Sequence, residues 1–241
     1  MRNIALPIMV IIVFTSCLYL VRRAKALQII AIDEAASTKG VFVALAIWAV
    51  VCFWMGLRGI HAEPWLLEAV PLLWQSMVAV VIFMTWFLFS PKLRKTLAKV
   101  ADHTPVATLV FIQALRIGAI GSILKTYLGL IVSNFPYWVG IPDFIFGLSA
   151  LLIGALVVRG FIGHQVLAVW HIVGATIILL PLVGLMNYWM NEPGFLFIFE
   201  YPMILAPSLV VPVLISLNMF AAWASLRALQ HPTQSKPSIA R

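Results

Sequence analysis

The sequence predicts an all-α protein, built as one bundle of seven transmembrane helices. The first observation is composition: 63% of the 241 residues are hydrophobic and only 10% are charged, whereas soluble domains carry about 25% charged residues. The second is that seven apolar runs each approach the length of about 20 residues that a spanning helix needs. The third is that basic residues lie between these runs and alternate loop by loop. The length fits a single domain, 1–241.

The expected helices cover about 4–21, 40–60, 66–90, 105–131, 137–158, 165–190 and 199–228, with a tail at 229–241. Only 22–39 and 91–104 form longer connections. We expect the first helix to be retained, because most of its flanking positive charge follows the apolar run, at Arg22, Arg23 and Lys25. A cleaved signal peptide carries that charge before the run.

Most of the 16 basic residues fall on one side of this arrangement. Because cytoplasmic loops of membrane proteins are rich in Lys and Arg, we expect the N-terminus outside and the C-terminus in the cytoplasm of a multi-pass protein of the bacterial inner membrane. Basic residues spread between apolar runs do not indicate nucleic-acid binding. The residues on the basic side are Arg22, Arg23, Lys25, Lys39, Lys92, Arg94, Lys95, Lys99, Arg159, Arg227, Lys236 and Arg241, against Arg2 and Arg58 on the other.

The fourth run contains the most polar residues. Arg116 lies eleven residues past Pro105, which places it ~17 Å into the helix at about 1.5 Å per residue. Gln113 precedes it by three residues and shares nearly the same face. A charged group at this depth indicates a functional site facing the bundle interior.

Lys125 lies nearer the outer end of the same helix and, at about 100° per residue, faces away from Arg116. We therefore expect it at the interface, where a lysine can extend toward water. Asp143 has two interpretations. It forms a first-turn salt bridge with Lys125, or it is a binding-site carboxylate of an outward cavity, linked through water to Arg116.

Helix five has two candidate starts, Tyr137 and Pro142. Proline is favoured in the first turn of a helix, and a start at Pro142 would put Asp143 where the helix dipole favours an anion.

The later helices add a histidine, an asparagine and two prolines. His171 lies inside the sixth run, and a lone buried histidine supports neither haem, which needs ligands across a pocket, nor zinc, which needs a cluster. No cofactor is expected. Pro207 and Pro212 precede Asn218 in the last helix. Interior prolines free backbone carbonyls, so this element is a kink, a hinge or part of a cavity wall.

Several of these residues resemble a family of small bacterial seven-helix membrane proteins that has no established activity. Its Gln-x-x-Arg stretch and Gly-Asp turn, its Trp-Asn-x-x-Gly element and its Pro-x-x-x-x-Pro element have counterparts over 105–228. His171 stands in the Asn position, Asn218 in a His position, and Pro142 before the aspartate. The resemblance implies an architecture and an Arg/Asp site, not a reaction. The matching residues are Gln113, Arg116, Gly129, Phe135, Gly140, Asp143, Gly147, Trp170, Gly174, Pro207 and Pro212.

Three functions fit these observations. The first is binding or transport of a small molecule through an outward-facing cavity, with Arg116, Asp143, Gln113, Lys125, His171 and Asn218 as ligand-binding candidates and Pro142, Pro207 and Pro212 as hinges. The second is an accessory subunit of a membrane complex. The third, which we rank lowest, is an enzyme acting on a lipid or isoprenoid, because no acid cluster or metal motif is present. A rhodopsin is excluded, since the last helix lacks a Schiff-base lysine.

Overall fold

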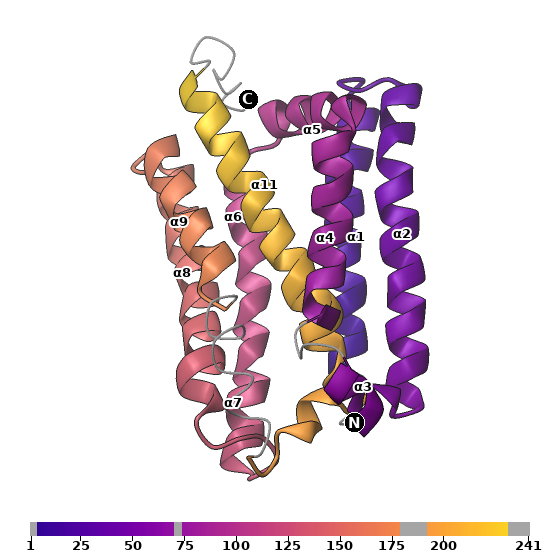
Figure 1. Cartoon of the computed structure of the whole chain (residues 1–241). Helices are drawn as coiled ribbons and strands as arrows, with labels where there is room; N and C mark the ends of the chain where they lie inside the picture. The colour runs from indigo at the N-terminus through magenta and orange to yellow at the C-terminus, as the bar shows by residue number, and fades with distance from the viewer. Residues whose placement is uncertain (1–3, 70–73, 179–191, 231–241) are drawn as a thin grey trace.

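A computed structural model describes residues 4–69, 74–178 and 192–230, and all regular structure in these ranges is helical. The all-α prediction is therefore confirmed. Figure 1 shows most helices running side by side between two ends of the molecule, with α5 lying across one end. The α-helices are α1 (Ala5–Ala26), α2 (Ile32–Leu57), α3 (Pro64–Ala69), α4 (Trp74–Phe89), α5 (Pro91–His103), α6 (Val106–Ile112), α7 (Ile120–Tyr127), α8 (Ile141–Val158), α9 (His164–Thr176) and α11 (Val211–Gln230).

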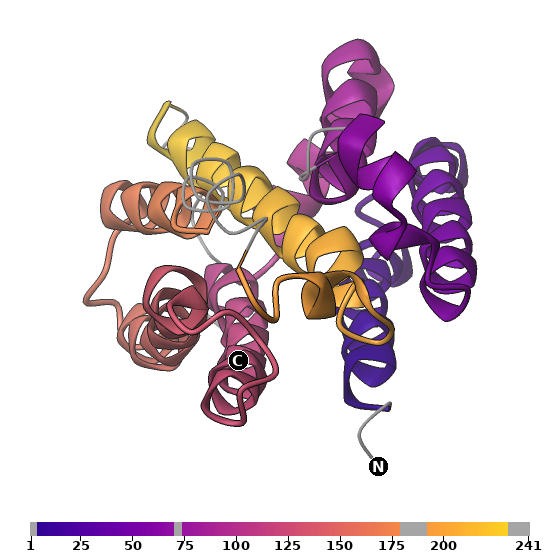
Figure 2. The same ribbon diagram turned by 60° about the horizontal axis from the view of Figure 1, so that its bottom comes forward.

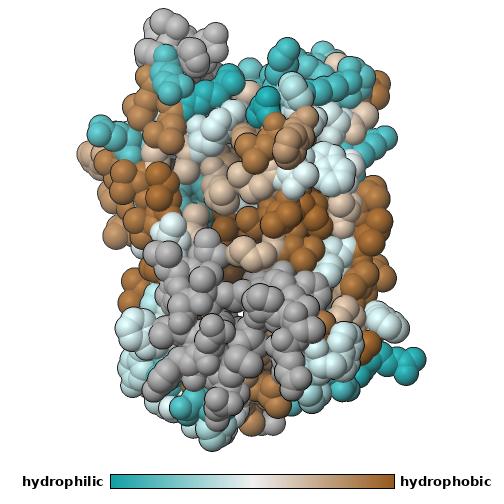
Figure 3. All heavy atoms as spheres, in the orientation of Figure 1, coloured by the Kyte–Doolittle hydropathy of each residue, from teal (hydrophilic) through white to brown (hydrophobic). Residues whose placement is uncertain are grey.

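Within the described ranges, 5 helical segments are long and apolar enough to cross a membrane, or up to 6 if a bent pair counts as one span. Where the described residues are visible in Figure 3, apolar side chains lie along the sides and upper middle of the face, and hydrophilic ones gather at its two ends. Both findings support a multi-pass membrane protein. The 5 segments are Ala5–Ala26, Ile32–Leu57, Val106–Tyr127, Pro136–Val158 and Ala206–Gln230.

The sequence predicts a long connection at 22–39, and the structure contradicts it. Residues 22–39 are mostly helical, because α1 continues to Ala26 and α2 already begins at Ile32. The start of α2 is stabilised by Glu34, whose carboxylate accepts a hydrogen bond of 2.9 Å from the Ala31 amide. Acidic residues in a first turn also suit the helix dipole. The polar ends of both helices therefore extend past their apolar runs.

The second long connection, 91–104, also proved helical. It forms α5, which bends by 101° from the preceding helix at a single residue, Ser90. Ser90 caps α5 by accepting a hydrogen bond of 3.2 Å from the Leu93 amide, and Pro91 occupies the first turn. Arg94 reaches back to the carbonyls of Phe87 and Leu88 at the end of α4. The bend is thus capped from both sides.

Other boundaries differ less. Of the run predicted at 66–90, α3 and α4 are described on either side of residues 70–73, which lie outside the described part. The run at 165–190 is described as α9 to Thr176, and 179–191 lie outside the description. The last helix begins with a π turn, η5 (Ala206–Val210), rather than at 199, where a 3-10 turn, η4 (Leu196–Phe199), lies instead. The run at 105–131 ends at Tyr127.

Helix α11 lies at the centre of the bundle. In Figures 1 and 2 it runs diagonally, with α8 and α9 on one side and α1, α2 and α4 on the other. In the span Ala206–Gln230, which includes α11, 67% of the most apolar stretch is buried inside the protein. In the other four single spans, 17–28% of that stretch is buried. The other helices therefore present most of their surface outward, as helices in lipid do.

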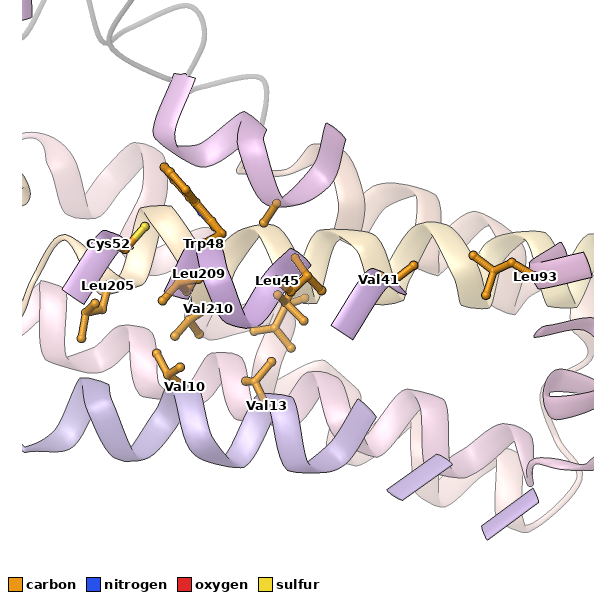
Figure 4. Close-up of a cluster of buried hydrophobic side chains, with 13 residues drawn as sticks. Val10, Val13, Val41, Leu45, Trp48, Cys52, Leu93, Leu205, Leu209 and Val210 are labelled. Atoms are coloured by element: carbon orange, nitrogen blue, oxygen red, sulfur yellow. The ribbon is translucent and has the colours of Figure 1, made fainter. Parts of the chain in front are cut away.

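One hydrophobic cluster joins α1, α2 and the start of α11. Figure 4 shows Val10 and Val13 of α1 pointing toward Leu209 and Val210, with Leu45 of α2 beside them. A second cluster packs around Phe195, Phe199 and Ile204 before η5. These contacts fix α11 against its neighbours on one side. On its other side α11 contacts buried polar side chains.

Charged side chains from four segments meet at the end of the molecule where α5 lies. Lys92 pairs with Asp33 at 3.1 Å, and Lys99 pairs with Glu34, which ties α5 to the start of α2. Arg227 of α11 pairs with Asp102 at 2.9 Å. Arg23 of α1 donates to the His103 carbonyl at 3.1 Å. The segments whose basic residues the sequence predicts on one side of the membrane therefore lie together.

Candidate functional site

The buried polar core begins with an ion pair. Arg116 Nη1 donates to Asp143 Oδ1 at 3.1 Å, and the two side chains are only 1% and 11% exposed. Arg116 lies within the span Val106–Tyr127 and Asp143 within the span Pro136–Val158. The carboxylate thus contacts Arg116 directly. The sequence predicts either a salt bridge between Asp143 and Lys125 or a link to Arg116 through water, and the direct contact differs from both.

Local structure brings Arg116 close to α8. The chain around it, η2 (Gln113–Ala119), is a 3-10 helix inserted between α6 and α7. In a 3-10 helix residues three apart lie on the same side, so Gln113 and Arg116 both face inward, and both are buried. Gly147 of α8 packs on this turn. A Cβ there would lie 2.5 Å from the Ile117 amide nitrogen, so only glycine permits the approach.

A second polar chain runs beside the ion pair. Asn218 Nδ2 of α11 donates to Gln113 Oε1 at 3.0 Å, and His171 Nδ1 of α9 lies 2.8 Å from Asn218 Oδ1. An amide oxygen only accepts hydrogen bonds, so His171 Nδ1 is the donor. All three side chains are at most 1% exposed. The chain joins α9, α11 and η2 in the interior of the bundle.

Aromatic rings cover the guanidinium. The Arg116 Cζ lies 4.9 Å from the centroid of the Phe146 ring, and Phe146 stacks on Trp170 at 4.4 Å. Gly174 leaves room for Phe146, since a Cβ there would lie 2.1 Å from that ring. Phe146 is a site residue that the sequence reading missed. The available signal was its position three residues after Asp143, on the same helix face.

Five of the six ligand-binding candidates therefore lie together, and Lys125 does not. Its Nζ lies 3.2 Å from Met203 Sδ and 5.6 Å from the centroid of the Phe197 ring. This agrees with the prediction that Lys125 and Arg116 face different ways. The group of Gln113, Arg116, Asp143, His171 and Asn218 is called the polar core below.

The two predicted starts of helix five correspond to two parts of one span. Helical structure begins with a π turn, η3 (Pro136–Gly140), and continues directly into α8, so the span runs from Pro136, close to the predicted start at Tyr137. The α-helix itself begins at Ile141, with Pro142 and Asp143 in its first turn, as the other start predicts. Counted from Pro136, Asp143 is about two turns inside the span.

Pro207 and Pro212 occupy a similar arrangement. The π turn η5 contains Pro207 and ends directly before Val211 and Pro212. Proline has no amide hydrogen, so Pro212 cannot donate to the Ser208 carbonyl four residues earlier. The Trp48 indole of α2 donates to that carbonyl instead, at 3.0 Å. The sequence predicts that a carbonyl freed by an interior proline needs a partner inside the bundle. The Trp48 indole is such a partner.

The described part of the chain contains no group of three or more His, Cys, Asp or Glu side chains that could hold a metal ion. Cys17 and Cys52 are both free thiols. Within these ranges the polar core offers charge and hydrogen bonding, and its carboxylate is already paired with an arginine. Comparison with protein families, with curated proteins and with solved structures finds no match.

Proposed function

We propose that the protein binds or transports a small molecule, with Arg116 as the anchor for a negatively charged group inside the membrane. The proposal depends on one observation. Nε and Nη2 of Arg116 are buried and have no hydrogen-bond partner among the described residues. Buried polar groups in proteins almost always have partners, so a guanidinium with free donors indicates a missing acceptor.

The chemistry of that acceptor follows from the geometry of the guanidinium. Nε and Nη2 form one edge of the planar group, and such an edge binds the two oxygens of a carboxylate in parallel. Asp143 occupies only Nη1. We propose that a carboxylate ligand takes this edge while Asp143 stays on Nη1. The negative charge of Asp143 then partly neutralises Arg116. Gln113 lies on the same side of η2 and supplies a further polar contact.

The first experiment measures binding to the purified protein in detergent. Formate, acetate, lactate and succinate are added separately, and the melting temperature is recorded. We expect at least one of them to stabilise the wild type by mass action and to have no effect on Arg116→Gln. If none of the four changes the melting temperature of the wild type, the proposed carboxylate site is wrong.

Arg227→Gln is the matched control, because it also removes an arginine from an ion pair, the one with Asp102 at 2.9 Å. That pair lies at the α5 end, outside the polar core. Arg227→Gln should keep the full response to the added carboxylate. A loss of response in both variants would mean that the effect depends on overall charge and not on Arg116.

A second candidate function is that of an accessory subunit of a membrane complex. It is favoured by the direct contact between Arg116 and Asp143, since that contact already joins two spans. In this case, the wild type would show no response to carboxylates, and a stoichiometric partner would co-purify with it. An enzyme acting on a lipid or isoprenoid remains the third candidate, and no observation at the polar core favours it.

We also propose seven crossings of the bacterial inner membrane, with the N-terminus outside and the C-terminus in the cytoplasm. The two further crossings would be α3 with α4, and α9 with the segment that follows it. The basic residues at the α5 end support this orientation, since such residues favour the cytoplasmic side. Exposed Trp65 and Trp138 suit the opposite interface.

A further inference from the structure

A second site of a different kind lies on the other side of α11 from the polar core. A cavity of about 90 Å³ is enclosed by α1, α2, α4, α5 and α11. Its walls are almost wholly apolar, and an apolar cavity in a protein stays free of water and takes up hydrocarbon. Figure 4 labels three of its lining residues, Val41, Leu45 and Leu93. Ala79 of α4 also lines the cavity.

The cavity lies under α5. Leu93, Leu97 and Val100 of α5 face into it, while Lys95 and Lys99 of the same helix are exposed. An amphipathic helix with lysines on its polar face is typical of a segment lying in a membrane interface. The cavity therefore starts at the depth where the headgroups of a bilayer give way to acyl chains.

The side of the cavity formed by α1 and α2 combines partly exposed lining residues with lysines that lack an ion-pair partner among the described residues. Its half-buried lining residues include Cys17 and Val21 of α1 and Phe42 of α2. Lys25 lies one turn beyond Val21 on the same face of α1, and Lys39 lies one turn before Phe42 on nearly the same face of α2. Both lysines are exposed, and no described residue forms an ion pair with either. Two free positive charges thus accompany an apolar entrance.

We propose that this cavity binds one acyl chain of an anionic phospholipid, whose phosphate lies between Lys25 and Lys39. Cys17 and Val21 lie four to eight residues below Lys25, which is about 6–12 Å along the helix, so the cavity receives the upper part of the chain. The volume is smaller than the ~150 Å³ cavity that holds benzene, which fits a segment of chain and not a whole ligand. The site is independent of Arg116 and of the function proposed above.

The test uses the full-length protein in lipid nanodiscs with a phosphatidylglycerol that carries a diazirine on its acyl chain. After illumination, mass spectrometry maps the crosslinked residues. We expect crosslinks concentrated at 17–21 and 38–45, removed by excess unlabelled dioleoylphosphatidylglycerol and kept in excess dioleoylphosphatidylcholine. Equal competition by both lipids would overturn the proposal, as would crosslinks spread evenly over outward-facing residues such as Ile11 and Ile47.

Two variants separate the charge from the cavity. Lys25→Gln with Lys39→Gln should reduce crosslinking at 17–21 at least fivefold, while Lys95→Gln, an exposed lysine on α5, should leave it unchanged. Ala79→Leu adds side chain to the cavity wall and should abolish crosslinking there without lowering the melting temperature. If crosslinking persists in the filled variant, the chain does not enter this cavity.

Discussion

Asn218 is the residue on which the second polar chain depends, because its amide joins a donor on α9 to an acceptor on η2. We predict that Asn218→Leu destabilises the protein by about 2–6 kcal/mol, since His171 Nδ1 and Gln113 Oε1 would each stay buried without a partner at ~1–3 kcal/mol apiece. Unfolding by SDS in detergent micelles measures the change.

Ser216→Ala provides the comparison on the same helix. The Ser216 hydroxyl donates to the Pro212 carbonyl within α11 at 2.9 Å, so its removal leaves no partner from another helix unsatisfied. We expect a cost under about 1 kcal/mol. A Ser216→Ala effect equal to that of Asn218→Leu would show that the bond between helices has no special weight.

The ion pair makes its own prediction. Arg116→Gln or Asp143→Asn should each cost about 3–5 kcal/mol, because each leaves an uncompensated buried charge, while the double variant should cost less than the sum of the two. The same SDS unfolding series measures this coupling. Additive effects would contradict a direct interaction between the two side chains.

Sequence reasoning identified the polar core residue by residue but not its contacts. Arg116, Gln113, Asp143, His171 and Asn218 were all selected because polar groups inside apolar runs are costly. The pairing of Asp143 with Arg116 was not predictable, since it depends on how much helical structure precedes Pro142. Trp48 was missed because an aromatic residue in an apolar run carries no distinguishing signal. Phe146 was missed although it lies three residues after Asp143, on the same helix face.

At the scale of elements, the close packing of α8 on η2 depends on Gly147. We predict that Gly147→Ala costs about 1–3 kcal/mol, because the added methyl group would lie 2.5 Å from Ile117 N and 2.8 Å from Arg116 C, both backbone atoms that cannot move aside. Gly121→Ala in α7 meets no atom within 4 Å and should be neutral or stabilise by up to ~1 kcal/mol. SDS unfolding compares the two, and equal effects would contradict the packing argument.

The bond between α2 and the start of α11 permits a test by a double-mutant cycle. Trp48→Phe should cost about 1–3 kcal/mol, since the Ser208 carbonyl loses its donor. In a Pro212→Ala background the cost of Trp48→Phe should fall. Residue 212 then has an amide hydrogen that can donate to the Ser208 carbonyl. Trp86→Phe, whose indole forms no hydrogen bond with a described residue, is the control. An unchanged Trp48→Phe cost in the Pro212→Ala background would contradict the interpretation.

The ends of elements were the least predictable feature. Hydropathy placed 137–158 almost as the structure has it, because apolar length and helix coincide there. It failed at 22–39 and 91–104, where polar residues outnumber the few buried apolar ones such as Leu93 and Val100, and where capping and ion pairs stabilise the helix ends. The seventh run, 199–228, was placed too early because Leu196–Phe199 is apolar but forms only a 3-10 turn.

For the whole molecule, charge at the α5 end leads to a prediction about topology. Green fluorescent protein fused after Arg241 should be fluorescent, and alkaline phosphatase inserted after Gly59 should be active, because the first folds in the cytoplasm and the second outside it. The reverse result would invert the proposed orientation. Neither fusion disturbs the polar core or the cavity under α5.

The two π turns before Pro142 and Pro212 have a consequence for insertions and deletions. A π turn holds one residue more than the α turn it replaces, so each resembles a helix that has absorbed a single-residue insertion. Removing one residue from Pro136–Gly140 or Ala206–Val210 would turn the residues directly before that π turn by about 100° around the helix axis and leave the helix after it, with Asp143 or Asn218, in place. Length variants in these two turns should therefore disturb the buried cluster around Phe135, Phe199 and Ile204 while the helices after the turns keep their register.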